Sequence, residues 1–229
     1  MFVPAFNDQV RAIEVVREVA ALSQRYRTLL IDDGSRIPAQ HSDLPANSLF
    51  FRMPMNVGLG ASTHVAFDHA LAGGYRAVVR LDGDGQHPVA EIAALLEPIE
   101  RGVADVVVGS RSNHNVGSGG GAFRRIAKAY YRFVASLMTR GAAPADVNTG
   151  FFAANMAAVE RLNRFTFERF PEPEIYVLAC RENLRVHQVA VEQAERSSGR
   201  STLGTLQGLR MLYRFSVFAI SELLRRREP

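Results

Sequence analysis

The regular alternation of short apolar runs with helix-forming stretches constrains the fold of this chain more than any other feature. Apolar runs at 28–31, 48–51, 76–81 and 105–110 have the length and composition of buried strands. The stretch 10–22 comes just before the first of these runs, and its apolar residues recur at the spacing of one helix face. Strands that alternate with helices in this way predict an α/β fold, in which a mainly parallel central sheet lies between two helical layers.

The second half of the chain is less regular. We expect a helix over 122–138, a turn and short strand in DVNTGFFAA, and a proline-stiffened acidic loop at FPEPE. A strand at 184–193 and a helix over about the last 25 residues complete the chain. Together these patterns predict one Rossmann-like domain over residues 1–203 and an amphipathic C-terminal helix over 204–229.

Length and composition exclude several classes of protein. A chain of 229 residues with 47% apolar residues can form one large domain with an ordinary core. No apolar run is long enough to span a bilayer, and no signal-like segment opens the sequence. The net charge of +4 comes without zinc-finger spacing or an RNA-binding motif, so we expect no nucleic-acid partner. The single cysteine, Cys180, fits a reducing compartment, so we expect a cytoplasmic protein, either free or at the inner face of the membrane.

One strand-like run ends in an unusual group of polar residues. In VVRLDGDGQHP, Asp82 and Asp84 are separated by one glycine, and Gln86 follows directly. Side chains two residues apart on a strand face the same way, so two carboxylates here would repel each other unless a cation lies beside them. Two carboxylates and an amide are ligands that suit Mg²⁺ or Mn²⁺. The alternative is an ordinary solvated turn between a strand and a helix.

A second acidic pair lies at the end of another predicted strand, in IDDGS. In a mainly parallel sheet the carboxyl ends of the strands share one edge, where ligands bind, so Asp33, Asp82, Asp84 and Ser110 should converge. A carboxylate at Asp33 could accept a hydrogen bond from a nucleobase or a ribose, or it could only stabilise a tight turn. The segment NVGLG lacks the third glycine of a dinucleotide fingerprint, and no Walker A sequence is present.

These motifs occur in the order seen in one known family. The chain carries VPAFND, IDDGS, NVGLGAS, LDGDGQHP, VVGSR, DVNTGFF, FPEPE and ERSSGRS. In this it resembles the family 2 glycosyltransferases of the GT-A fold, and most closely the branch of polyprenyl-phosphate (dolichol-phosphate) mannosyl- and glucosyltransferases. The resemblance covers roughly residues 2–203.

The resemblance implies a nucleotide-diphosphate-sugar donor, linked to GDP or UDP, and a divalent metal ion, Mg²⁺ or Mn²⁺. The implied metal ligands are Asp82, Asp84 and Gln86. The implied donor-binding residues are Pro4, Phe6, Asp8, Asp33, Asp82, Asp146, Arg196 and Ser201, with Thr149, Gly150 and Gly199 in the same motifs. Asp8 stands where glutamate is more usual, and Thr202 stands where the family pattern continues with lysine.

The resemblance also implies an acceptor site. Arg111 matches a position that binds the acceptor phosphate, and Arg124 or Arg125 would supply a second arginine for bidentate pairing. Glu172 and Glu174, in FPEPE, match positions near the acceptor in several members. A phosphate acceptor needs no general base, whereas a hydroxyl acceptor does. The expected catalytic residues are therefore Asp84, Arg111 and Glu174.

The leading hypothesis is a metal-dependent, inverting hexosyltransferase that acts on a polyprenyl phosphate such as dolichyl or undecaprenyl phosphate. The same donor chemistry with a saccharide or small hydroxyl acceptor is an alternative, and so is a non-catalytic nucleotide-sugar-binding protein. A nicotinamide oxidoreductase fits less well, since the glycine fingerprint is incomplete. The last helix is suited to packing on its own domain, to a homodimer contact, or to peripheral contact with a membrane through an apolar stripe flanked by arginines.

Overall fold

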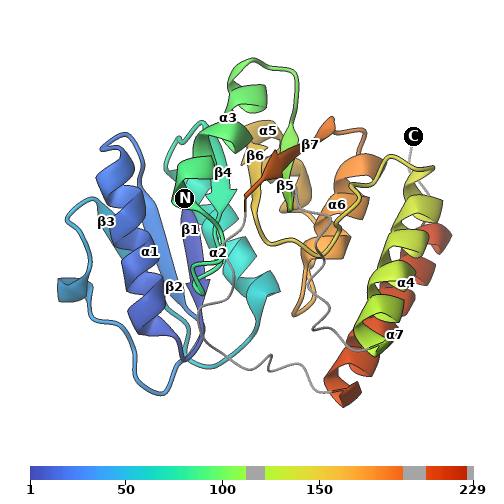
Figure 1. The fold of residues 1–229 in the computed structure, drawn as a ribbon, viewed down its shortest axis with the longest axis horizontal. Helices are drawn as coiled ribbons and strands as arrows, with labels where there is room; N and C mark the ends of the chain where they lie inside the picture. Colours follow the sequence, from blue (N-terminus) through green and yellow to red (C-terminus); the bar gives the residue numbers. More distant parts are fainter. Residues whose placement is uncertain (112–121, 193–204, 226–229) are drawn as a thin grey trace.

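The computed structural model describes residues 1–111, 122–192 and 205–225, and a seven-stranded sheet runs through the middle of this part of the chain (Figure 1). The strands lie in the order β3-β2-β1-β4-β6-β5-β7. Their bounds are β1 Phe2–Ala5, β2 Thr28–Asp32, β3 Ser48–Arg52, β4 Ala77–Arg80, β5 Val106–Arg111, β6 Phe152–Asn155 and β7 Val186–Val191. β6 runs antiparallel to both of its neighbours, and all other pairs are parallel. The predicted α/β fold with a mainly parallel sheet is confirmed.

Helices cover both faces of the sheet. One face carries α1 (Gln9–Leu22) and α3 (Ile92–Glu100), and the other carries α2 (Leu59–Ala72), α5 (Met156–Leu162) and α6 (Glu172–Arg181). Outside α6 lie α4 (Ala122–Thr139) and α7 (Thr205–Leu224), side by side at the right of Figure 1. Two short 3₁₀ turns, His41–Asp43 and Val89–Glu91, complete the elements of the described residues.

The two faces of the sheet form two separate apolar clusters because successive strand residues point to opposite sides. In β5, for example, Val106 and Val108 belong to the apolar cluster that includes residues of α4, α5 and α6, while Val107 belongs to the cluster that includes residues of α1 and α3. Strands that are buried on both faces need apolar residues at every position. This explains why the sequence shows continuous apolar runs here instead of an alternating pattern.

The topology brings the predicted polar residues to one edge of the sheet. β1, β2, β4, β5 and β7 all end at this edge, and the antiparallel β6 begins there. The loops that follow β1, β2 and β4 therefore lie near the turn that precedes β6. This edge is where a mainly parallel α/β sheet binds its ligands.

Two local predictions were wrong, and one short helix was not predicted. β4 ends at Arg80, so Asp82 and Asp84 lie in a turn and do not share a strand face. The glycines of DGDG interrupt the strand; Gly85, for example, has a positive φ of 69°. FPEPE is not a loop, because α6 begins at Glu172 and both of its glutamates occupy the first helical turn, where Pro173 is tolerated. The helix that was not predicted is α5, which has only 7 residues.

The C-terminal helix α7 does not have the single apolar side that the sequence predicted. Phe215 and Ala219 are buried against α4 and α6, whereas Leu209, Leu223 and Leu224 are exposed. Leu206 lies outside the residues whose side chains are described. The division of the chain into 1–203 and 204–229 stays a prediction, although α7 contributes side chains to the same apolar cluster as α4 and α6.

Candidate active site at the carboxyl edge of the sheet

The loop after β4 folds back on itself through His87. The imidazole ring stacks on Phe151, with ring centroids 4.8 Å apart and planes 14° apart. The backbone N–H of Asp82 donates to His87 Nδ1 at 3.0 Å, so the proton of the neutral ring lies on Nε2. That nitrogen is 3.7 Å from Asp82 Oδ2. Asp84 Oδ1 accepts from the backbone N–H of Gln86 at 3.1 Å, which fixes the other end of the loop.

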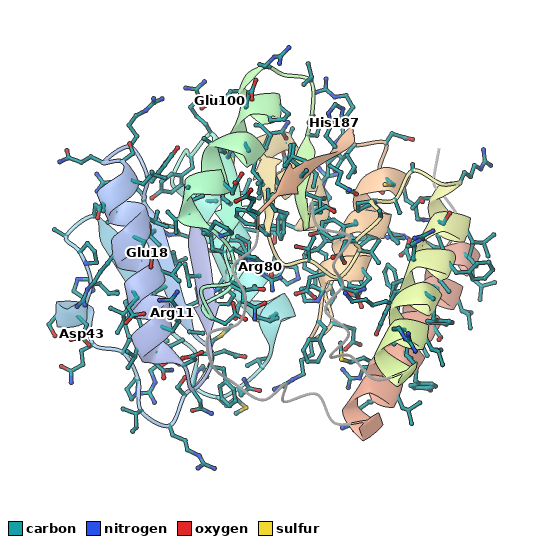
Figure 2. All side chains as sticks on the ribbon, in the orientation of Figure 1. Arg11, Glu18, Asp43, Arg80, Glu100 and His187 are labelled. Carbon is teal, nitrogen blue, oxygen red and sulfur yellow. The ribbon has the colours of Figure 1, made fainter. Side chains whose placement is uncertain are left out.

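The carboxylate of Asp82 is paired with a buried arginine. Arg80, the last residue of β4, is only 1% exposed, and Figure 2 places it in the middle of the molecule. Its Nη2 donates to Asp82 Oδ1 at 2.9 Å and to Glu172 Oε1 at 2.7 Å. Burial opposes the charge on Arg80, but the two carboxylates outweigh this effect and raise its pKa above the usual value. We call Arg80, Asp82 and Glu172 the buried ionic junction.

The turn before β6 packs tightly against this junction. A Cβ atom added to Gly150 would lie 2.6 Å from Asp82 Oδ1 and 2.9 Å from Arg80 Nη2. The preceding residue, Thr149, uses its carbonyl to accept a hydrogen bond of 2.6 Å from the hydroxyl of Tyr176 on α6. The junction therefore ties together the end of β4, the start of β6 and the first turns of α6.

Asp33 is held by the NVGLG segment. Its carboxylate accepts hydrogen bonds from Asn56 Nδ2 (2.7 Å) and from the backbone N–H groups of Val57 and Gly58 (2.8 Å each). Gly58 has φ +106°, a conformation that only glycine adopts at little cost. These three bonds give the motifs IDDGS and NVGLG a structural role, and they occupy three of the acceptor positions of the Asp33 carboxylate. A contact between Asp33 and a nucleobase stays a prediction.

The loop after β1 contributes the other predicted donor-binding residues. Pro4 is buried within β1, Phe6 is 47% exposed, and Asp8 is an exposed residue before α1 without a side-chain capping bond. Between them Asn7 has φ 56° and takes a hydrogen bond from the backbone N–H of Arg36, which fixes this loop beside the loop after β2. An exposed aromatic ring and an exposed carboxylate thus lie at the same edge as Asp33.

The remaining predicted residues are described to different extents. Asp146 is half-buried in the turn before β6, where its Oδ1 accepts from the backbone N–H of Asn148 at 3.2 Å. Arg125 is exposed on α4. Arg111 ends β5 and Arg124 lies in α4, but their side chains are outside the described part of the structure. Arg196, Gly199, Ser201 and Thr202 also fall outside the described residues.

The two glutamates of FPEPE occupy different environments. Glu172 is paired with Arg80, which it shares with Asp82. Glu174 is 3% exposed, and its Oε2 accepts from the backbone N–H of Glu168 at 2.9 Å. Burial raises the pKa of Glu174 from 4.5 to about 7, and the carboxylates of Glu168 and Glu172 add to this shift. A carboxyl group with a pKa near neutrality can exchange a proton at physiological pH.

The side chains at this edge carry oxygen atoms of the kind that binds a divalent cation. Asp84 and Gln86 are half-buried at the mouth of the site, and the side chain of Asp82 is 33% exposed although Arg80 shares its charge. The described residues contain no cluster of three or more His, Cys, Asp or Glu side chains arranged to hold a metal. An ion bound here would therefore take Asp84, Asp82 and Gln86 and complete its shell with water or substrate oxygens, as Mg²⁺ commonly does.

Sequence reasoning missed two residues of the site, Arg80 and Tyr176, and gave His87 no role. Arg80 could have been found, because a charged residue inside the apolar run VVRL is rarely buried without a partner. Its partner Glu172, which lies 92 positions further along the chain, could not. Tyr176 gives no local signal, since an aromatic residue in an apolar helix is typical of any core.

Comparison with known proteins places this chain in one enzyme family. The family model for glycosyl transferase family 2 matches residues 1–162. The chain belongs to glycosyl transferase family 2, and the class that the motifs predicted, a glycosyltransferase of the GT-A fold, is confirmed.

The individual relatives have low sequence identity to this chain. A polyprenol monophosphomannose synthase from Mycolicibacterium smegmatis is 30% identical over 120 residues, which cover 48% of this chain and 44% of that protein. The matched stretch is thus less than half the length of that relative. A dolichyl-phosphate beta-glucosyltransferase from Trichomonas vaginalis is 22% identical, and the match covers 94% of this chain and 72% of the length of that protein.

The fold is shared with solved structures at low sequence identity. A crystal structure of glucosyl-3-phosphoglycerate synthase from Mycobacterium tuberculosis, in complex with Mn²⁺, UDP and glucosyl-3-phosphoglycerate, superposes with a TM-score of 0.68. Its sequence is 16% identical, and the match covers 96% of this chain and 77% of that one. At this identity the similarity concerns the fold alone.

Proposed function

We propose that this chain transfers a hexose from a nucleotide-diphosphate sugar, linked to UDP or GDP, to a polyprenyl phosphate, with inversion at the anomeric carbon. The observation that carries the proposal is the Asp82–Gln86 loop, whose oxygen atoms lie at the ligand-binding edge of a family 2 glycosyltransferase. The acceptor is supported by two relatives, one named for polyprenol monophosphomannose synthesis and one for dolichyl-phosphate glucosylation.

The donor would lie across the carboxyl ends of β1, β2 and β4. Phe6 would stack on the base, and Asp8 would accept from the ribose, because both are exposed beside Asp33. Asp84, Asp82 and Gln86 would hold Mg²⁺ or Mn²⁺, and a fold relative solved with Mn²⁺ and UDP supports such an ion. When bound, the ion would neutralise the charge that gathers on the departing diphosphate. Arg196 and Ser201 would contact the same diphosphate, and Asp146 the sugar.

The acceptor oxygen would attack the anomeric carbon from the side opposite the diphosphate. The bond between that carbon and the diphosphate oxygen breaks, and its electron pair leaves with the nucleoside diphosphate. Arg111, with Arg124 or Arg125, would hold the acceptor phosphate through charge-assisted hydrogen bonds. A phosphate monoester already carries a nucleophilic oxygen, so this chemistry requires no general base.

The buried ionic junction would keep the donor loop in place during this reaction. Arg80 fixes one carboxylate oxygen of Asp82, and His87 fixes the backbone of the same residue. Both contacts are made by the chain's own residues, so they would hold the loop in one conformation around the donor. Preorganised polar groups cost no reorganisation when charge develops in the transition state.

A hydroxyl acceptor is the second candidate, and one observation favours it. The pKa of Glu174 is raised to about 7, which suits a general base for a hydroxyl group. Against this, its side chain is buried and accepts a hydrogen bond from Glu168. A catalytic role for Glu174 therefore requires a hydroxyl to reach it from the α6 side of the site.

Product analysis tests the proposal and separates the two acceptors. The full chain would be incubated with radiolabelled UDP- or GDP-hexoses, Mn²⁺ and a short-chain polyprenyl phosphate, followed by organic extraction. Label that moves to the organic phase only when protein, metal and lipid phosphate are all present supports the proposal. Label that stays aqueous in a new glycoside indicates a hydroxyl acceptor, and nucleotide-sugar binding without turnover on any acceptor supports a non-catalytic binding protein.

A further inference from the structure

The loop after β4 packs directly on the first turn of α1. Gly83 is buried, and a Cβ atom added to it would lie 2.9 Å from the carbonyl oxygen of Pro4 and 3.1 Å from Cβ of Ala12. Contacts this short leave no room for a side chain at position 83. The first glycine of the DGDG motif therefore allows the loop to approach β1 and α1 closely.

Gly85 contacts the same turn of α1 through a charged side chain. A Cβ atom added to Gly85 would lie 2.5 Å from Nη2 and 2.7 Å from Cζ of Arg11, and closer still to Nε. Three atoms of one guanidinium group are involved, so the flat group covers the side of Gly85 from which a side chain would project. We call Arg11 and Ala12 together the α1 floor of this loop.

Carboxylates of the same helix hold Arg11 from its other side. Its Nη1 lies 2.6 Å from Glu14 Oε2 and 3.9 Å from Glu18 Oε1. Figure 2 labels Arg11 and Glu18 on α1. Because Glu14 balances the charge of Arg11 at contact distance, the guanidinium offers little net positive charge to a diphosphate. What it offers to the loop is a flat surface in a fixed place.

The Nε atom of Arg11 takes no part in this pairing. It is buried and has no hydrogen-bond partner among the described residues. A buried N–H group without an acceptor costs free energy, and an arginine on a surface helix can avoid this cost by turning its guanidinium into water. The side chain of Arg11 is 37% exposed, so that route is open. The position against Gly85 is therefore not explained by the hydrogen bonds of the arginine itself, and this points to a role for the contact.

The α1 floor lies between two groups of residues that the proposed function assigns to the donor. Asp8 directly precedes α1, while Asp84 and Gln86 flank Gly85. Asp84 Oδ1 and the backbone N–H of Gln86 close the turn internally at 3.1 Å. That bond fixes the shape of the turn, whereas the contacts of Gly83 and Gly85 fix its place relative to α1.

We propose that Arg11 is a positioning residue for the divalent ion. Its guanidinium group would support the turn from Asp84 to Gln86, so that the oxygen atoms of both side chains stay where the ion needs them. Arg11 would act by its shape, because its charge is paired with Glu14. This inference rests on the proposed function, which assigns the ion to this loop. Its test uses no acceptor, so the two can fail separately.

Calorimetry of nucleotide binding tests this role. The affinity of the full chain for UDP and for GDP would be measured with and without Mn²⁺, and the nucleotide that binds the wild type more tightly would be used for the variants. In Arg11→Ala, we expect the factor by which Mn²⁺ strengthens nucleotide binding to fall by about tenfold, as when a group that orients metal ligands is removed. Affinity without Mn²⁺ should change by less than about twofold, whereas general damage to the site would lower both affinities equally.

Two further variants separate shape from charge. Arg11→Lys keeps a cation beside Glu14 but lacks the flat group, so it should lose as much of the Mn²⁺ effect as Arg11→Ala. Gly85→Ala adds a Cβ atom that overlaps with the guanidinium, and the double variant Arg11→Ala with Gly85→Ala removes this overlap. Gly85→Ala should therefore lower the Mn²⁺ effect by about tenfold in the wild type, but by less than about threefold when Arg11 is already alanine.

The matched control Arg17→Ala changes an arginine of the same helix that donates to the carbonyl oxygen of Asp43 at 2.8 Å, and it should keep the wild-type Mn²⁺ effect. The proposal is overturned if Arg11→Ala also keeps that effect, if Arg11→Lys restores it, or if Gly85→Ala costs the same factor in both backgrounds. An equal loss of affinity with and without Mn²⁺ would assign Arg11 to the nucleotide and would also overturn it. A wild type whose nucleotide binding does not depend on Mn²⁺ would refute the proposed metal site itself, and the role of Arg11 with it.

Discussion

The buried ionic junction and the exposed surface of α4 and α7 use the same residue type in opposite ways. In the junction, Arg80 is 1% exposed and is held by two carboxylates from distant parts of the chain. On the surface of α4, Arg125 and Arg132 are exposed, and the same helix also exposes large apolar side chains. A buried charge must be paired, so the junction determines local structure, whereas an exposed charge remains available to a partner. Substitutions should therefore change stability and chemistry in the first region and have little effect on stability in the second.

The largest effect is expected at the metal-binding edge beside the junction. Asp84→Ala removes a carboxylate that we assign to the ion, so turnover of the sugar donor should fall by about a thousandfold or more, as expected when several kcal/mol of transition-state stabilisation are lost. Melting temperature should change much less than turnover, because the Asp84 side chain is half-buried in the loop after β4 and is not part of either apolar cluster. Steady-state kinetics at several Mn²⁺ concentrations measures the loss. Near-normal turnover in this variant would refute the role of Asp84.

The next effect is on stability within the junction. Arg80→Met leaves Asp82 and Glu172 near each other without their cation, which should cost about 3–5 kcal/mol of unfolding free energy. The double variant Arg80→Met with Glu172→Gln removes one of the two charges and should recover part of that loss. Urea unfolding of both variants measures the difference.

The double variant also separates stability from positioning. If Arg80 positions Asp82 for the donor, the refolded double variant should bind the donor nucleotide more weakly than the wild type even where it is fully folded. A double variant that is no more stable than Arg80→Met alone, or that binds the nucleotide normally, would show that the junction does not act as described.

A smaller effect is expected at Asp33. Asp33→Asn places an amide where three N–H groups point, so at least one donor loses its acceptor at a cost of about 1–3 kcal/mol. The matched control Asp8→Asn changes an exposed aspartate without a capping bond and should stay within about 0.5 kcal/mol of the wild type. Equal stability of the two variants would mean that Asp33 is not needed to hold the NVGLG segment.

The pKa of Glu174 predicts a pH-dependent difference. In the unfolded chain this carboxyl loses its proton near pH 4.5, whereas in the folded chain it keeps the proton to about pH 7. Burial therefore opposes folding increasingly as the pH rises from 4.5 to 7, and the penalty is complete above pH 7. Glu174→Gln has no such penalty, so it should match the wild type below pH 4.5 and exceed it by on the order of 1–3 kcal/mol at pH 8. Parallel melting curves across this range that keep a constant separation would contradict the shifted pKa.

The smallest effect on stability is expected at the outer surface. Phe133→Gln, Tyr213→Gln and Leu224→Gln change side chains that are at least 68% exposed, so each should alter the unfolding free energy by less than about 0.5 kcal/mol. A large loss of stability would mean that these side chains of α4 and α7 are packed against other parts of the same protein. In that case the surface of α4 and α7 would contribute to stability, as the buried ionic junction does.

The sequence was sufficient for the fold and for the general place of the site because both follow from local patterns. Continuous apolar runs identified the strands of a sheet that is buried on both faces, and the Asp-Gly motifs identified the loops at its carboxyl edge. The FPEPE segment was misread because proline is typical both of loops and of a first helical turn.

Long-range pairing could not be predicted in the same way. Nothing near Arg80 indicates that its second carboxylate comes from Glu172, and nothing near Asp33 indicates that its partners are Asn56, Val57 and Gly58. Apolar residues recur at helical spacing in α4 and in α7, but the sequence does not indicate that these two helices pack against each other. These features depend on how distant segments are brought together, and this is a property of the fold as a whole.

Diffraction from crystals soaked with Mn²⁺ and a nucleoside diphosphate tests the central assignment most directly. The account predicts an anomalous manganese peak within bonding distance of Asp84, with diphosphate oxygens on its other side and the base near Phe6 and Asp33. A nucleotide that binds in this crystal elsewhere on the chain, with no manganese beside Asp84, would contradict it.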